Sequence, residues 1–343
     1  MSTKPKILLI YTGGTIGMMK DYKSNALKAF DFSQLLDKIP ELQQLNCQIE
    51  SISFKNPIDS SNMNTNYYVD IVEIIEKNYD LFDGFVILSG SDTMSYISSA
   101  ISFMLENLQK PVIFTGSQLP IGDLRTDAKE NLITSIEVAC TQKNGVPMIQ
   151  EVCLYFEYKL YRANRTTKMN AEQFEAFVSM NYPPLAESGV YLKFNEHYLS
   201  NKSDASSSLI VSKKLVTDIT ILKIFPGITK NVVESILNIK NLKGIVIETF
   251  GSGNAPNETW FINLIKKAIE KNIRIVNVTQ CLGGNVNQGH YETSVALKKI
   301  GVISGKDITT EAAVAKLMYL LNEDFSISEF TYYFEKPLRG EIS

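Results

Sequence analysis

Short apolar runs alternate with stretches of helical periodicity along most of this 343-residue chain. An apolar run of four to six residues is too short for a buried helix and is typical of a strand covered on both faces. Because parallel strands need a helical crossover, the alternation predicts an α/β fold, with a mainly parallel sheet flanked by helices. In the first half we expect strands near 6–10, 49–54, 84–88, 111–115 and 151–156, and helices near 33–38, 67–78, 93–107 and 127–141.

A second series of the same kind begins near Asp218. Before it, residues 183–217 are rich in Pro, Ser, Asn and Lys, which is typical of loops. Since the chain exceeds one ordinary core, we predict a larger N-terminal α/β domain over 1–190, a linker over 191–217 and a smaller C-terminal α/β domain over 218–343. The second series has expected strands near 219–224, 244–248 and 273–277, and expected helices near 229–239, 257–271, 292–299 and 309–322.

Charge and hydropathy exclude several classes of partner. The formal net charge is −3 and the isoelectric point is about 5.7, so no basic surface favours nucleic acid or an anionic membrane. No apolar run approaches the length of a membrane span, and the amino terminus lacks a signal-peptide pattern. We therefore expect a cytoplasmic protein that binds neither nucleic acid nor membrane.

The few cysteines and histidines argue against a metal site. His197 and His290 are far apart in the sequence and have no cluster of other ligand residues near them, so we expect no bound metal. The cysteines are widely spaced, form no C-x-x-C pair and are expected to be reduced and mostly buried. These are Cys47, Cys140, Cys153 and Cys281.

The first predicted strand ends in the glycine-rich turn Tyr11-Thr12-Gly13-Gly14-Thr15-Ile16-Gly17. In open α/β sheets, ligands bind at the carboxyl ends of the strands. Glycines let backbone N–H groups approach a ligand there, and Thr15 places a hydroxyl among them. The turn matches neither glycine-rich phosphate-binding pattern. Thr15 is thus a candidate acyl-transfer nucleophile, and a purely structural strand-to-helix turn is the alternative.

Three further predicted strands end in small polar residues. Strand 84–88 leads into Ser89-Gly90-Ser91-Asp92-Thr93, strand 111–115 into Gly116-Ser117-Gln118, and strand 49–54 into the segment Asp59-Ser60-Ser61. A helix N-cap would account for Asp92 or Thr93 but not for the whole group. Together these strand ends predict one polar pocket for a small zwitterionic or amide-bearing molecule.

The order and number of these motifs carry a resemblance. Nearly end to end, the chain resembles the bacterial type I (cytoplasmic) L-asparaginases of the asparaginase/glutaminase family. Each motif alone is moderately specific, and their combination makes the resemblance strong. The motifs occupy residues 11–17, 59–63, 90–94, 115–120, 124–127, 160–168, 251–256 and 279–281.

The resemblance implies hydrolysis of L-asparagine to L-aspartate and ammonia, without metal or cofactor. Thr15 matches the nucleophile that forms an acyl-enzyme. Ser91, Asp92 and Lys168 resemble a hydroxyl–aspartate–lysine triad. An alcohol is a weak nucleophile until a neighbour takes its proton, and lysine can do so only when neutral. Burial favours neutral Lys168 whereas Asp92 favours the ammonium form, and the sequence leaves that balance open.

The same resemblance assigns the substrate contacts. Asp59 and Ser60 match positions that hold the α-amino and α-carboxylate groups, and Ser117 and Gly90 are assigned to substrate binding with them. Asn254 matches a position that reaches into the active site of a neighbouring subunit. The resemblance therefore implies a homo-oligomer, either a dimer or a dimer of dimers.

The chain departs from the family pattern at several positions. Ser89 and Ser91 stand where the family usually has His and Thr, and Ser91 lacks the methyl group that stiffens χ1. Tyr22 is the nearest candidate for the lid tyrosine that activates the nucleophile. Glu248 stands where an arginine that grips an effector carboxylate is expected, which argues against allosteric activation by asparagine.

Two functions follow as hypotheses. The first is an L-asparagine amidohydrolase with a threonine nucleophile and weaker L-glutaminase activity. The alternative is a non-catalytic or weakly active amino-acid-binding or regulatory member of the family. It is motivated by Ser89, by Ser91 and by the insecure match of Tyr22.

Overall fold

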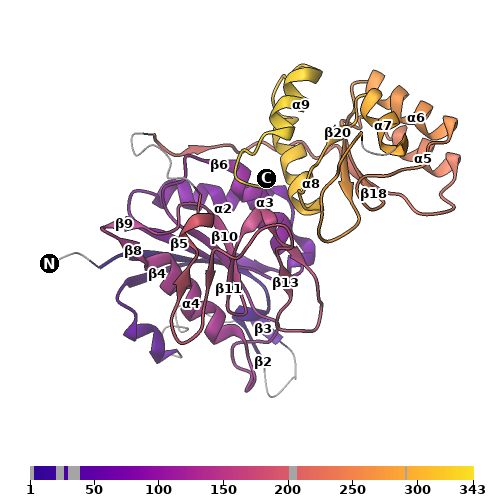
Figure 1. Cartoon of the computed structure of the whole chain (residues 1–343). Coiled ribbons are helices and arrows are strands. Elements are labelled where there is room, and N and C mark those ends of the chain that lie inside the picture. Colours follow the sequence, from indigo (N-terminus) through magenta and orange to yellow (C-terminus); the bar gives the residue numbers. More distant parts are fainter. Residues whose placement is uncertain (1–3, 21–26, 30–38, 201–206, 290–291) are drawn as a thin grey trace. The chain divides into compact units, whose positions relative to one another are not determined.

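The computed structural model describes residues 4–20, 27–29, 39–200, 207–289 and 292–343. The chain divides into two units, Met1–Lys213 and Lys214–Ser343, and each is built around its own sheet (Figure 1). The predicted α/β class, with a larger mainly parallel sheet followed by a smaller α/β unit, is confirmed. The predicted helix near 33–38 lies outside the described residues.

The N-terminal unit is built on an eight-stranded sheet with the order β15-β14-β11-β10-β7-β5-β1-β4. The strands from β10 to β4 run parallel to their neighbours in the sheet. Strands β11, β14 and β15 extend the sheet beyond β10, and each pairs antiparallel with the strand before it. The strands are β1 (Lys6–Gly13), β4 (Gln48–Ile58), β5 (Gly84–Leu88), β7 (Val112–Thr115), β10 (Val152–Phe156), β11 (Lys159–Arg162), β14 (Ala186–Glu187) and β15 (Lys193–Phe194).

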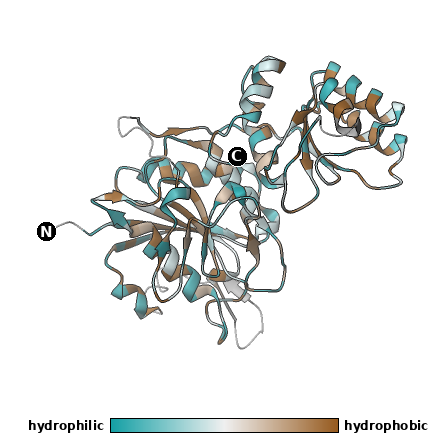
Figure 2. Cartoon of the chain, in the orientation of Figure 1, coloured by the Kyte–Doolittle hydropathy of each residue, from teal (hydrophilic) through white to brown (hydrophobic). Residues whose placement is uncertain are grey.

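Helices cover both faces of this sheet (Figure 1). On one face, α4 (Ala128–Cys140) packs Leu132 and Ile136 into a core cluster with residues of β1 such as Leu9. Helix α3 (Met94–Met104) contacts β7 and β10, and its buried side chains lie outside that cluster, so α3 and its neighbour α2 (Thr65–Asn78) cover the other face. The central strands are correspondingly apolar along their length (Figure 2).

Part of the segment predicted as a linker belongs to the N-terminal unit. Within 191–217, β15 pairs with β14 in the main sheet, and β16 (Ile210–Val211) pairs with β6 (Leu105–Glu106). The division between the units falls after Lys213, within the predicted linker. The β6 pairing also ends α3 at Met104, short of the predicted end near 107. Strands of two residues are too short to show hydrophobic periodicity, so they could not be predicted from the sequence.

Three short hairpins complete the described part of this unit. They are β2 (Met18–Lys20) with β3 (Leu27–Ala29), β8 (Gln142–Lys143) with β9 (Val146–Pro147), and β12 (Thr167–Lys168) with β13 (Phe177–Val178).

The C-terminal unit has a parallel four-stranded sheet with the order β17-β18-β19-β20. Its two faces carry separate core clusters, one with side chains of α5 and α6 and the other with side chains of α8 and α9. Of its elements, β20 and α9 were not predicted. The elements are β17 (Ile219–Lys223), α5 (Lys230–Leu237), β18 (Gly244–Thr249), α6 (Thr259–Glu270), β19 (Arg274–Thr279), α7 (Glu292–Lys299), β20 (Ile303–Ser304), α8 (Thr310–Leu320) and α9 (Ile327–Glu335).

A buried ion pair lies inside the C-terminal unit. The side chains of Lys316, on α8, and Glu341 are both fully buried. The Lys316 ammonium donates to the Glu341 carboxylate, to the Phe334 carbonyl oxygen at 2.6 Å and to the Lys336 carbonyl oxygen at 2.7 Å. All three ammonium protons thus have an acceptor, which offsets the cost of burying the charge. Burial lowers the pKa of Lys316, and the Glu341 charge opposes that shift.

Within the described ranges, none of the helices has both the length and the apolar character that crossing a membrane requires.

The turn between β10 and β11 holds two residues in the left-handed region. Glu157 has φ 43° and Tyr158 has φ 69°, a conformation that favours Asn and Gly. Burial, and then the charges of Asp127, Glu130 and Glu175, raises the pKa of Glu157 to about 7. Near neutral pH the turn therefore combines backbone strain with an unfavourable carboxylate.

Glu157→Asn is expected to stabilise the N-terminal unit, by about 1 kcal/mol from the relief of strain. The gain should be larger at pH 8 than at pH 5. The pKa of Glu157 is raised to about 7 in the folded protein, so the folded wild type loses stability relative to the unfolded chain as the pH rises toward and through 7. Asparagine does not ionise, so the variant does not lose this stability. Thermal melts at the two pH values measure it. Tyr158→Asn is the matched control, with a gain that does not depend on pH over this range. Equal gains for Glu157→Asn at both pH values would contradict the assigned cost of the carboxylate.

Candidate active site

Three loops meet at the carboxyl edge of the parallel strands. Gly14, after β1, has φ 85°, and a Cβ atom built on it would lie 2.3 Å from the backbone nitrogen of Gly90, after β5. A Cβ built on Gly90 would lie 2.5 Å from the Oγ atom of Ser60, after β4. Side chains at these two glycines would therefore collide with the neighbouring loop. The glycines allow the loops that carry Thr15, Ser60 and Ser91 to touch.

Thr15 begins a short 3₁₀ turn, Thr15–Gly17, directly after the Gly14 contact. The Tyr11 ring supports this turn, because a Cβ on Gly17 would lie 2.2 Å from the Tyr11 Cζ atom. Thr15 itself is half-buried. By contrast, the Thr12 hydroxyl is buried and donates to the Leu88 carbonyl oxygen at 3.0 Å, which ties β1 to β5. Of the two threonines in the turn, Thr12 has a structural hydrogen bond and Thr15 stands at the loop junction.

Ser91, Asp92 and Lys168 form one hydrogen-bonded group. The Lys168 ammonium donates to Ser91 Oγ at 2.8 Å and to Asp92 Oδ1 at 2.7 Å. The Lys168 side chain is only 16% exposed, whereas that of Asp92 is 67% exposed. Ser91 and Lys168, which the family resemblance assigned to one group, are 77 positions apart in the sequence and in direct contact in the structure. Asp92 holds the lysine from the solvent side, and Ser91, 9% exposed, holds it from the protein side.

The β12–β13 hairpin brings Lys168 to this position. Its register pairs Lys168 with Phe177. Immediately before it, the Thr166 hydroxyl donates to the Ala163 carbonyl oxygen at 2.7 Å and lies 3.2 Å from the Ser95 hydroxyl on α3. The segment that leads to the lysine is therefore anchored to the helix that starts just after Ser91.

Gln118 is a site residue that the sequence reasoning did not select. Its Oε1 atom accepts a hydrogen bond from the Ser91 hydroxyl at 3.3 Å, and its Nε2 atom donates to the Gln173 carbonyl oxygen at 2.9 Å. The buried Asp127 carboxylate accepts from the backbone N–H of Gln118 at 2.8 Å, which holds the loop in place. Ser91 Oγ can thus accept from Lys168 and donate to Gln118 at the same time.

Ser117, which the sequence favours over Gln118, turns inward. Its side chain is buried and its hydroxyl donates to the Leu119 carbonyl oxygen at 2.6 Å, within its own loop. Ser89 is likewise fully buried at the end of β5, with its hydroxyl 3.3 Å from the Gly90 carbonyl oxygen. The sequence alone could not tell which members of these polar turns face outward.

Asp59 and Ser60 stand at the end of β4. The Asp59 carboxylate accepts from the backbone N–H of Ser61 at 2.9 Å and from its hydroxyl at 2.8 Å. These bonds lower the pKa of Asp59, so the carboxylate is ionised at neutral pH. The Thr93 hydroxyl donates to the Ser60 carbonyl oxygen at 2.9 Å and ties this loop to the one after β5.

The sequence analysis also singled out Tyr22, Asn254 and Glu248. Tyr22 falls outside the described residues. Asn254 belongs to the C-terminal unit, where its carbonyl oxygen accepts from the Phe250 N–H at 2.9 Å. In the same unit, the Glu248 carboxylate accepts from the Thr310 hydroxyl at 2.7 Å and lies 3.2 Å from Lys223. Glu248 is thus already paired with a cation.

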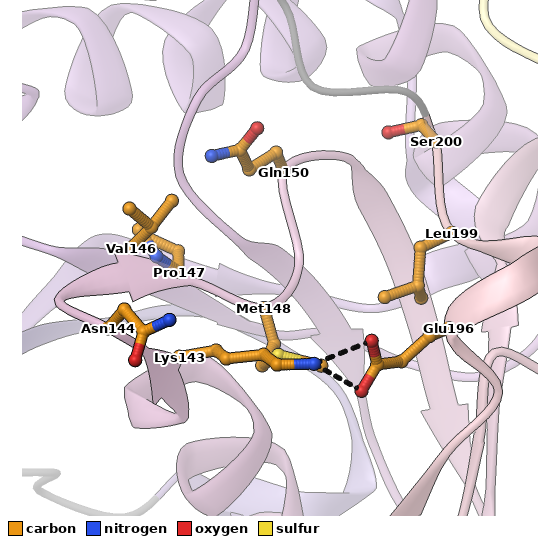
Figure 3. Close-up of a pocket in the computed structure, with 9 residues that line it drawn as sticks. All are labelled: Lys143, Asn144, Val146, Pro147, Met148, Gln150, Glu196, Leu199 and Ser200. Carbon is orange, nitrogen blue, oxygen red and sulfur yellow. Dashed lines mark hydrogen bonds and ion pairs between the residues drawn. The ribbon is translucent and has the colours of Figure 1, made fainter.

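The N-terminal unit also contains a cavity of about 570 Å³ (Figure 3). The β8–β9 hairpin lines one side and residues 196–200 line the other, and Lys143 pairs with both Glu196 carboxylate oxygens at 2.8 Å. None of the predicted site residues lines it.

Comparison with known proteins agrees with the geometry. Residues 6–199 match the family described as "Asparaginase, N-terminal", and residues 218–334 match the "Glutaminase/Asparaginase C-terminal domain". The chain is 39% identical to L-asparaginase 1 of Escherichia coli (strain K12), over 99% of this chain and 98% of that protein. It is 37% identical to the 60 kDa lysophospholipase of Mus musculus, over 100% of this chain but only 63% of that protein.

A solved structure shows the same fold. The crystal structure of L-asparaginase I from Vibrio cholerae matches with a TM-score of 0.89 and 39% identity, over 99% of both chains. Both halves of the chain therefore match, in order, the two parts of one family. The chain belongs to the asparaginase/glutaminase family.

Proposed function

We propose that this protein hydrolyses L-asparagine to L-aspartate and ammonia, with weaker activity on L-glutamine. The observation that carries the proposal is the Lys168 contact with Ser91 and Asp92, beside the loop junction that presents Thr15. A partly buried ammonium held between a hydroxyl and a carboxylate is suited to relay protons, and membership of the asparaginase family supplies the substrate class.

In the proposed reaction, the Thr15 hydroxyl oxygen attacks the side-chain amide carbon. The hydroxyl proton leaves through the relay, and backbone N–H groups of the glycine-rich loop stabilise the oxyanion. The amide nitrogen takes up a proton and departs as ammonia, which leaves a β-aspartyl ester on Thr15. Water then attacks the ester, one proton returns to Thr15, and L-aspartate is released. No metal or cofactor takes part.

The relay uses Lys168 as the group that exchanges a proton with Ser91. Lys168 is 16% exposed and contacts both Ser91 Oγ and Asp92 Oδ1, so it lies where a proton can pass between the serine and the lysine. Gln118 keeps the Ser91 hydroxyl oriented by accepting its hydrogen bond. This orientation compensates for the missing β-methyl group of threonine at position 91.

Recognition of the amino-acid end falls to the other loops. Ionised Asp59 is suited to bind the substrate α-ammonium, and Ser60 and the Gly90 backbone to bind the α-carboxylate. We further propose that Asn254 completes the site of a neighbouring copy in a cytoplasmic homo-oligomer, a dimer or a dimer of dimers. Ser117 supports its own loop under this proposal.

Ammonia release from purified protein tests the function. With L-asparagine, steady ammonia formation is expected, and Thr15→Ala should reduce it to background because the nucleophile is lost. L-Glutamine should be a slower substrate. Sizing of the same sample by light scattering reports the oligomeric state.

The assay also separates the proposal from its rival, a binding protein without turnover. The rival predicts that L-aspartate raises the melting temperature while L-asparagine yields no more ammonia than with Thr15→Ala. The intact contact between Ser91 and Lys168 favours the hydrolase.

A further inference from the structure

A buried asparagine, Asn131, contacts the loop that carries Gln118. Asn131 lies near the start of α4 and is fully buried. Its Nδ2 atom donates to the Gly116 carbonyl oxygen at 3.0 Å and to Asp127 Oδ2 at 3.3 Å, and its Oδ1 atom accepts from the backbone N–H of Glu157 at 3.0 Å. A half-turn of the amide would set its oxygen against two acceptors and its nitrogen against a donor. These partners therefore fix the orientation of the side chain.

Asp127 connects this amide to the loop after β7. The buried Asp127 carboxylate accepts from the backbone N–H of Gln118 at 2.8 Å through Oδ2, and from that of Leu119 at 3.0 Å through Oδ1. The Asn131 amide bonds to the same Oδ2 atom, so it holds the carboxylate in the orientation that serves both N–H groups. Asn131 thus holds the loop directly through the Gly116 carbonyl oxygen and indirectly through Asp127.

The loop held in this way packs against the loop that carries Ser91. A Cβ atom built on Gly116 would lie 2.4 Å from the Ser89 carbonyl oxygen, so the two loops touch. From this loop, the Gln118 side chain accepts the hydrogen bond from the Ser91 hydroxyl at 3.3 Å. That bond is already long for two oxygen atoms, so a small shift of the loop would break it.

We propose that Asn131 is a positioning residue for the hydrolysis, because it holds the loop from which Gln118 orients the Ser91 hydroxyl. This inference rests on the proposed function. It requires that Asn131 influence turnover through Gln118. Once the Gln118 side chain has been removed, the loss of Asn131 should therefore cost little more, whereas two residues that act separately would have additive effects.

Kinetics of single and double variants test this route. Asn131→Ala and Gln118→Ala should each lower kcat for asparagine about tenfold, because each releases the Ser91 hydroxyl from its acceptor. The double variant should also be impaired about tenfold, and not about a hundredfold. KM should change less than about twofold, since the proposed contacts of Asp59 and Ser60 with the substrate come from the loop after β4.

Two further variants serve these measurements. Thr134→Ala is the matched control, because Thr134 is a buried residue of the same helix whose hydroxyl donates to Glu130 at 2.9 Å. It should leave kcat unchanged. Asn131→Ser replaces Asn131→Ala if the latter fails to fold, since serine keeps a polar group there but has one donor for two acceptors.

Hydrogen exchange measures the hold on the loop without any turnover. In Asn131→Ala, peptides that span residues 116–120 should exchange at least about tenfold faster than in the wild type, because the acceptor of the Gln118 and Leu119 N–H groups is no longer fixed. Thr134→Ala should leave their exchange unchanged. Unchanged exchange in Asn131→Ala, or a loss of kcat near a hundredfold in the double variant, would overturn the proposal. A wild type that releases no ammonia would refute the proposed function, and the exchange rates would still decide whether Asn131 holds the loop.

Discussion

Lys168→Met is expected to lower kcat for asparagine hydrolysis by about 10³-fold, with a much smaller change in KM. Methionine keeps an unbranched apolar side chain in the partly buried position but removes the donor that reaches Ser91 at 2.8 Å and Asp92 at 2.7 Å. The proton released during attack then has no relay. Steady-state ammonia assays measure the effect, and circular dichroism establishes that the variant is folded.

Two further variants separate proton transfer from charge. Lys168→Arg keeps a cation that cannot release its proton, so it should be almost as impaired as Lys168→Met. A kcat of the Lys168→Arg variant within about tenfold of the wild-type value would refute proton transfer by Lys168 and leave only an electrostatic role. Lys143→Met is the matched control, because that lysine forms an exposed ion pair with Glu196 and its loss should leave kcat unchanged.

Lys316→Met is expected to destabilise the C-terminal unit by about 3–5 kcal/mol. The substitution leaves the Glu341 carboxylate buried without a counter-ion and deprives the carbonyl oxygens of Phe334 and Lys336 of their donor. Urea unfolding followed by fluorescence measures the loss for this unit alone. The single tryptophan of the chain, Trp260, lies on α6 and reports on it selectively.

A second substitution tests the cause of that loss. Adding Glu341→Gln to Lys316→Met removes the isolated charge but keeps an acceptor for the backbone N–H groups of Leu338 and Arg339, so part of the stability should return. Lys266→Met, which breaks only an exposed pair with Glu270, should change the stability little. If Lys316→Met lowered the free energy of unfolding no more than Lys266→Met does, the assigned cost of the isolated Glu341 charge would be wrong.

The sequence predicts the parallel part of the fold because its signals are local. The apolar runs at 6–10 and 84–88 predict β1 and β5, and the polar turns that follow them lie at the site. The antiparallel extension was missed, since β14 and β15 have two residues each and no periodicity. Their pairing depends on neighbours that the sequence does not reveal.

The candidate site was predictable only in part, because the positions of some of its residues depend on tertiary contacts. Lys168 was identified only through the family resemblance, because a lone lysine is usually on the surface and its burial here depends on the β12–β13 hairpin. Gln118 was missed in favour of Ser117, because backbone bonds such as that from Gln118 to Asp127 decide which side chain turns toward Ser91.

The contact between Gly14 and Gly90 bears on how this enzyme could be redesigned. Main-chain atoms set the separation of the two loops there, because the atoms of Gly90 that lie nearest to Gly14 belong to the backbone. A mutant library aimed at a new amide substrate should hold both glycines constant, since a side chain at either one would push the loops after β1, β4 and β5 apart.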